Sequence, residues 1–179
     1  MVKDDHLWLA EEIESRKRKA KPRERGFLTQ LGHSFREAGA FFYKIQDLPH
    51  FAGSQFRFDA EKPFDAFAAY QGFAMAIEGK SLTGYEAFGV SQLRQCQIDG
   101  LNLFQDNGAS FVMINVKTKK VTIDGTAKMN RLLILDWREH GERLVKHSSI
   151  KKAELAAMPY IECVGERFDL RPWLMSLTK

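Results

Sequence analysis

Three side chains with complementary chemistry, Asp65, Glu78 and Lys80, lie on two strand-like segments that a Gln-Gly dipeptide separates. Such a dipeptide resembles the two-residue turns of β-hairpins. If Tyr70 pairs with Phe73, then Asp65 lies directly opposite Glu78, with Cβ atoms about 4.5–5.5 Å apart. Alternation along the strand puts Lys80 on the same face as Glu78. The hairpin therefore predicts a cluster of two carboxylates and one ammonium group.

Two ionised carboxylates at this separation repel each other by roughly 3 kcal/mol at an effective dielectric constant near 20. A hard divalent cation would relieve the repulsion, and Mg²⁺ prefers one or two carboxylates together with water and phosphate oxygens. We therefore expect Asp65 and Glu78 to be metal ligands. A metal so placed suits hydrolysis of a phosphodiester, with Lys80 orienting the attacking water and offsetting negative charge. Each residue alone fits an ordinary solvated strand better, and only their shared register favours a site.

Gln97 is the fourth candidate site residue. It interrupts an apolar helical stripe of Val90, Leu93, Leu101 and Phe104, so it is expected to face inward, where an unpaired amide is costly. Two interpretations stay open. The amide either bonds the lysine, a water or a phosphate of the site, or it satisfies a backbone carbonyl in the core.

The remaining pattern alternates helical and strand-like segments around this hairpin, with a buried strand at Ser110–Val116. It predicts an α/β fold with a mixed central sheet flanked by helices. The other expected elements are a helix from Phe27 to Gly39, a strand at Ala40–Ile45, a loop or short protruding element at Gln46–Lys62, a helix within Val90–Phe104, strands at Val121–Ile123 and Arg131–Trp137, a helix at Ser149–Met158 and an apolar turn at Trp173–Leu177.

Length and charge divide the chain into two parts. The 179 residues, 44% of them hydrophobic, suffice for one core, which we assign to a nuclease domain at residues 25–179. Residues 1–24 are expected to form a basic arm or helix, because they lack the apolar positions to join this core. The positive charge concentrated near the arm suggests contact with DNA phosphates. The alternative interpretation is an ordinary solvated surface. The candidate DNA-binding residues are Arg16, Lys17, Arg18, Lys19, Lys21, Arg23 and Arg25, with Lys44 of the first strand in a minor role.

Membrane insertion and secretion are not expected. No apolar run approaches the ~18 residues of a membrane helix, and the charged start lacks the apolar stretch of a secretory signal. The two cysteines, Cys96 and Cys163, stand far apart without metal-ligand spacing, so neither a disulfide framework nor a zinc site is predicted. We expect a cytoplasmic protein.

The hairpin resembles the PD-(D/E)xK motif of the restriction-endonuclease-like superfamily. Pro63-Phe64-Asp65, twelve intervening residues and Glu78-Gly79-Lys80 carry this resemblance. Other segments are similar to the RecU-type Holliday-junction resolvases of bacteria and phages, over about residues 25–174. These are Arg25-Gly26, Phe42-Tyr43-Lys44-Ile45, Gln97-Ile98, the stretch 108–114, Leu133–Trp137 and Ser149–Leu155.

The resemblance implies a dimeric, Mg²⁺-dependent endonuclease, with Mn²⁺ as an alternative metal, that resolves four-way DNA junctions. It implies catalytic roles for Asp65, Glu78 and Lys80, and Gln97 takes the place of a glutamine that follows the motif. A two-fold dimer suits paired cuts in two related strands. The alternatives are a nuclease of other specificity, for repair, restriction or end trimming, and a non-catalytic DNA-binding accessory protein of recombination.

Two features depart from the family pattern. Gln30 stands where an acidic residue of the first helix is expected, and Glu24 or Glu37 could substitute only in another register. A neutral ligand there would leave a reduced site with two protein carboxylates. The segment of residues 46–62 is also shorter than the protruding stalk of RecU proteins. The resemblance therefore implies junction selectivity less directly than it implies nuclease chemistry.

Overall fold

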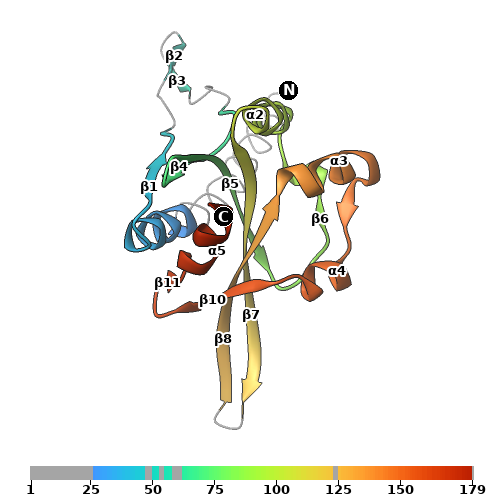
Figure 1. Ribbon diagram of the computed structural model, residues 1–179. Coiled ribbons are helices and arrows are strands. Elements are labelled where there is room, and N and C mark those ends of the chain that lie inside the picture. Colours follow the sequence, from blue (N-terminus) through green and yellow to red (C-terminus); the bar gives the residue numbers. More distant parts are fainter. Residues whose placement is uncertain (1–25, 47–49, 53–54, 58–61, 123–124, 179) are drawn as a thin grey trace, which may run out of the picture.

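A seven-stranded mixed sheet forms the centre of the protein (Figure 1). The computed structural model describes residues 26–46, 50–52, 55–57, 62–122 and 125–178. In the sheet, β5 and β7 are parallel and the other neighbouring strands are antiparallel. The order is β1 (Phe41–Lys44), β4 (Ala66–Tyr70), β5 (Phe73–Thr83), β7 (Ala109–Thr122), β8 (Gly125–Asp136), β10 (Tyr160–Val164) and β11 (Arg167–Phe168).

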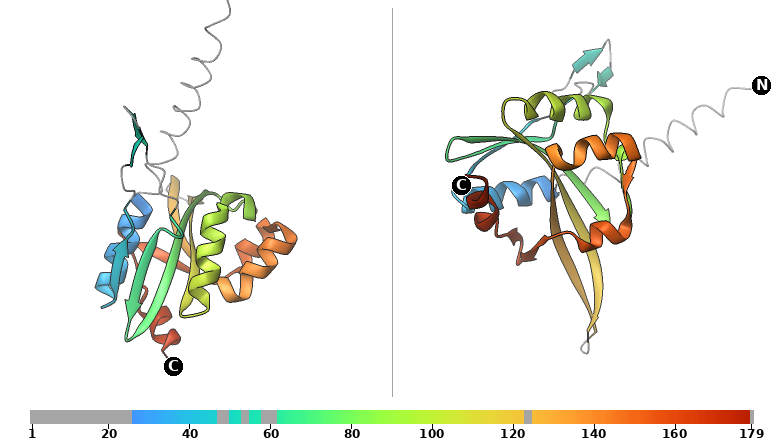
Figure 2. Two further views of the ribbon diagram at one scale, coloured as in Figure 1. Left: turned by 90° about the horizontal axis from the view of Figure 1, so that it is seen from above. Right: turned by 45° about the vertical axis from the view of Figure 1, so that its right-hand side comes forward.

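Helices cover both faces of this sheet (Figure 2). The helix of residues 26–37 and α5 (Arg171–Leu177) pack on one face, where Phe35 and Leu174 meet Phe111 of β7 in one apolar core. On the other face lie α2 (Gln95–Gln105), α3 (Trp137–His147) and α4 (Lys152–Ala157), which share a second core with β7 and β8. The expected α/β class, with a mixed central sheet flanked by helices, is confirmed.

The helix of residues 26–37 follows from its apolar spacing. Leu28, Leu31 and Phe35 recur along one face and are buried. The helix stops at Gly39, whose φ of +79° suits glycine. The backbone N–H of Gly39 donates to Arg36 and that of the next residue to Phe35, which is a Schellman arrangement. The expected end of this helix is therefore confirmed.

The β4–β5 hairpin has the expected register. Tyr70 pairs with Phe73 and Ala66 with Ile77. Gln71 and Gly72 both have positive φ, +49° and +83°, as a type I′ turn requires. Because the turn twists in the same sense as the strands, it fixes the register locally. Continued by one residue beyond Ala66, this register places Asp65 opposite Glu78.

Several elements differ from the expectation. The stripe at Val90–Phe104 is two elements, a 3₁₀ turn at Val90–Gln92 and then α2, because Leu93 and Arg94 are extended. The strand expected up to Trp137 ends at Asp136, whose side chain accepts the N–H of Arg138 and caps α3. The helix expected at Ser149–Met158 is only α4 (Lys152–Ala157), because Ser149 and Ile150 pair as a strand, Lys151 is extended, and Met158 before a proline is extended. α3, β10 and β11 were not anticipated.

Two strand pairs lie outside the central sheet. β2 (His50–Ala52) pairs with β3 (Gln55–Arg57) in the segment expected to be a loop or protrusion, and this hairpin stands apart from the sheet (Figure 1). β6 (Phe88–Gly89) pairs with β9 (Ser149–Ile150). Among the residues that the structure describes, no helix has the length and apolarity to span a membrane.

Candidate active site

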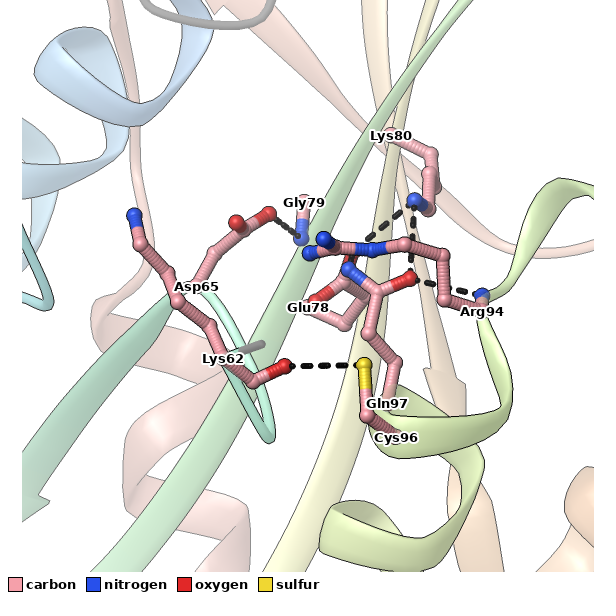
Figure 3. Close-up of polar contacts among 8 residues, drawn as sticks. All are labelled: Lys62, Asp65, Glu78, Gly79, Lys80, Arg94, Cys96 and Gln97. Carbon is pink, nitrogen blue, oxygen red and sulfur yellow. Dashed lines mark hydrogen bonds and ion pairs between the residues drawn. The ribbon is translucent and has the colours of Figure 1, made fainter. Parts of the chain in front are cut away.

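Glu78 is the centre of a polar network on β5 (Figure 3). Its side chain has no exposed surface. Oε1 lies 2.8 Å from Nζ of Lys80 and accepts a hydrogen bond from Nε2 of Gln97 at 2.6 Å. An ionised carboxylate can stay buried only with such partners. The residues predicted to form the site, Glu78, Lys80 and Gln97, thus meet in space.

Asp65 lies across the hairpin from Glu78, one residue before β4. Its backbone N–H donates to the carbonyl of Ile77, which continues the ladder beyond Ala66. Its Oδ2 accepts the backbone N–H of Gly79 at 3.0 Å. The carboxylate of Asp65 is therefore held against the strand that carries Glu78, as the register predicted.

Gln97 faces inward and is only 2% exposed. While Nε2 donates to Glu78, Oε1 accepts the backbone N–H of Arg94 at 2.9 Å and lies 3.5 Å from Nζ of Lys80. Gln97 is the third residue of α2, from which a glutamine can reach back to the N-cap N–H. The amide therefore does not satisfy a backbone carbonyl: its short bonds go to Glu78 and to the N–H of Arg94, with Lys80 at 3.5 Å, and its catalytic role stays a prediction.

The environment of Glu78 raises its pKa from 4.5 to about 7. Burial is the largest cause, and the negative charge of Asp65 adds to it. Lys80 opposes the shift by its charge and its hydrogen bond, and Arg94 opposes it to a smaller extent. The carboxyl of Glu78 therefore changes charge near neutral pH.

The donor atoms at this place fit a hard divalent cation. In the described part of the chain, Oε2 of Glu78 is a buried carboxylate oxygen without a hydrogen-bond partner. A second carboxylate, that of Asp65, lies just before the neighbouring strand β4. Oxygen ligands of this kind suit Mg²⁺ or Mn²⁺, which keep waters in their remaining positions. Across the described ranges, no group of three or more acidic, histidine or cysteine side chains is arranged to hold a metal, so these two carboxylates are the protein ligands to consider.

Comparison with solved structures gives a weak similarity of fold. No protein-family model matches the sequence, and no curated protein matches it significantly. The fold is similar to that of Hjc, a Holliday junction resolvase from the archaeal hyperthermophile Archaeoglobus fulgidus. The identity is 17% and the TM-score 0.36, over 73% of this chain and 95% of that chain.

Gln30 and Glu37 of the first described helix do not extend the site. Nε2 of Gln30 donates to Sγ of Cys163 on β10 at 3.0 Å. Glu37 forms an ion pair with Arg167 on β11. Both side chains are thus engaged with the far end of the sheet, and neither supplies the acid expected from this helix.

The predicted DNA-binding residues are only partly described. Lys44 lies on the edge strand β1 as the register partner of Ala66, the neighbour of Asp65 in the chain. The other candidates, which lie in the basic arm or directly after it, are outside the described residues. They are Arg16, Lys17, Arg18, Lys19, Lys21, Arg23 and Arg25, and their contact with DNA stays a prediction.

Sequence reasoning missed Arg94. This exposed residue is the N-cap of α2, and its side chain points toward Asp65 and Glu78 (Figure 3). A basic residue at a helix N-terminus opposes the helix dipole, and arginine is not among the residues favoured at the N-cap. That anomaly was visible once α2 was known to begin at Gln95.

Proposed function

We propose that the protein is a divalent-metal-dependent DNA endonuclease whose site consists of Asp65, Glu78, Lys80 and Gln97. The observation that carries the proposal is the buried carboxylate of Glu78, which Lys80 and Gln97 bond at one oxygen while the other oxygen lacks a partner. A structural ion pair would not need a second carboxylate, that of Asp65, held across the same hairpin. This cluster, on a Pro-Phe-Asp and Glu-Gly-Lys hairpin, fits the PD-(D/E)xK pattern.

Each side chain has a defined task in this proposal. Asp65 and Glu78 hold Mg²⁺ or Mn²⁺, which when bound polarises the scissile phosphate and activates water. The N–H of Gly79 fixes the carboxylate of Asp65, and the amide of Gln97 fixes that of Glu78. Lys80, 14% exposed, can reach both Glu78 and solvent. Its ammonium orients the attacking water and offsets the negative charge that develops at the phosphate.

We further propose that the substrate is a four-way DNA junction and that the protein acts as a homodimer. Resolution of a junction needs paired cuts in two related strands, and a two-fold dimer presents two copies of one site. The resemblance of the chain to RecU-type resolvases supports this choice. A nuclease of other specificity, for repair, restriction or end trimming, shares the same chemistry and differs only in substrate.

A non-catalytic accessory protein of recombination is the second candidate. Gln30, where the family pattern has an acidic residue, donates to Cys163 instead of joining Asp65 and Glu78. A site with two protein carboxylates binds metal less tightly than one with three. Such a protein would bind DNA in a salt-sensitive manner without cutting it.

Cleavage of a labelled synthetic four-way junction, beside a duplex of matched sequence, tests the proposal. The wild type and Asp65→Asn are assayed with Mg²⁺, with Mn²⁺ and with EDTA. We expect paired, symmetric nicks that need the metal and are lost in Asp65→Asn, with DNA binding retained. Equal cleavage of the duplex would assign another specificity. Tight binding without cutting under either metal would support the accessory function.

A further inference from the structure

We propose that Arg94, together with the N-terminus of α2, forms a phosphate-binding subsite that holds the DNA backbone beside the two carboxylates. This inference rests on the proposed nuclease function and names the group through which that site recognises its substrate. The ligand is one phosphodiester group of DNA.

The first line of support is position. Arg94 immediately precedes α2, and Figure 3 shows its side chain extending from the start of the helix toward Asp65 and Glu78. The guanidinium is near enough to Glu78 to act on its charge. Lys80 is already engaged with Glu78 at 2.8 Å, whereas Arg94 is exposed. A phosphate that approaches the carboxylates from solvent therefore meets the guanidinium of Arg94.

The second line of support is the electrostatics of α2. A helix of eleven residues carries a partial positive charge at its N-terminus. Arginine at this position adds like charge and makes no capping hydrogen bond with its side chain. This arrangement costs helix stability and is offset when an anion binds. The helix end and the guanidinium thus attract the same ligand.

The third line of support is chemical fit. A guanidinium donates two parallel N–H bonds to a phosphate, which fixes the orientation of the phosphate as well as its distance. Placed beside the metal ligands, such a group would position the backbone for attack. The role of Arg94 is binding and positioning, since proton transfer and metal binding fall to other residues.

The geometry allows a clean test, because the structural and the proposed roles of Arg94 use different atoms. Its backbone N–H donates to Oε1 of Gln97 at 2.9 Å, and every residue except proline retains that N–H. Arg94→Ala therefore keeps the bond that orients Gln97 and removes only the side chain. Arg94→Lys keeps the charge but loses the paired donors.

Arg138 provides the matched control. It is an exposed arginine near the N-terminus of α3, and its backbone N–H is likewise held by a side chain, that of Asp136. It lines a surface pocket with Gln105 and Asp106, at the opposite end of α2 from Arg94. Arg138→Ala thus removes the same charge from a comparable helix position away from the carboxylates.

The experiment measures DNA affinity against salt concentration for Arg94→Ala, Arg94→Lys and Arg138→Ala, with Mg²⁺ and in an Asp65→Asn background that prevents cutting. We expect Arg94→Ala to weaken binding about 10-fold or more and to lower the salt slope by about 0.9, as for one lost phosphate contact. Arg94→Lys should keep the slope and lose part of the affinity. Arg138→Ala should have the same DNA affinity and the same salt slope as its parent.

Two results would overturn the subsite. One is an Arg94→Ala variant with the affinity and slope of its parent, or with losses equal to those of Arg138→Ala. The other is an Arg94→Ala variant, in an otherwise wild-type chain, that binds Mn²⁺ more tightly in the absence of DNA while its affinity for DNA is unchanged. That would make Arg94 a counter-ion of the carboxylates. The proposed nuclease function would fail through a different result, namely a wild-type protein that binds DNA but does not cut it with either metal.

Discussion

Gln97 donates a 2.6 Å hydrogen bond from Nε2 to the buried carboxylate of Glu78, across 19 residues of sequence. Its other amide atom, Oε1, accepts the backbone N–H of Arg94 at the start of α2. One side chain therefore joins the first turn of a helix to the charged centre of the sheet. This amide therefore links the position of the start of α2 to that of the Glu78 carboxylate.

Replacement of Gln97 by alanine should lower the free energy of unfolding by about 2–4 kcal/mol. The variant loses a hydrogen bond to a buried charged group and one to a backbone N–H. Urea denaturation at pH 8 in EDTA measures the change. Gln95→Ala is the control, since Gln95 is exposed on the same helix and bonds only the exposed Asp99 in the described contacts. Equal effects of the two substitutions would contradict the linking role of Gln97.

The raised pKa of Glu78 predicts a pH-dependent cost to stability. The carboxyl has a pKa near 4.5 when unfolded and about 7 when folded. Well below pH 4.5 it is protonated in both states and does not change the free energy of unfolding. As the pH rises to 7, the carboxyl ionises first in the unfolded state, so the free energy of unfolding falls by about 3 kcal/mol. The wild type should thus lose stability relative to Glu78→Gln between pH 4.5 and 7, in EDTA.

Unfolding free energies at several pH values measure this difference. Glu86→Gln serves as the control for removal of one negative charge, because Glu86 is exposed in the loop after β5. A constant difference between the wild type and Glu78→Gln over this pH range would refute the assignment.

Gly100 of α2 positions the segment that leads to Asp65. A Cβ at this glycine would lie 2.4 Å from both the Cβ and the carbonyl oxygen of Pro63. Because backbone cannot yield as a flexible side chain can, Gly100→Ala should cost about 3 kcal/mol or more and displace Asp65 from Gly79. Thermal or urea unfolding measures the loss. At Gly26 an added Cβ meets nothing within 4 Å, so Gly26→Ala should be neutral or stabilising.

Local sequence predicted the hairpin correctly because its contacts are local. The Gln71-Gly72 turn and the alternation of β4 and β5 set the register, and the register places Asp65 opposite Glu78. The helix of residues 26–37 was equally readable, since apolar spacing and Gly39 mark its face and its end. In contrast, α3 is mostly polar, with Trp137 and Leu144 as its large buried side chains, so its low apolar content hid a helix that packs on the sheet.

The sequence by itself determined the α/β class, the hairpin register and the residue types of the candidate site, because these depend on neighbours within a turn or a strand. Only the tertiary structure decided where α2 begins, that Arg94 points toward the carboxylates, and that Gln30 bonds Cys163, 133 residues away. These contacts depend on how helices pack on the sheet, and packing sums many weak interactions between distant segments that no local pattern records.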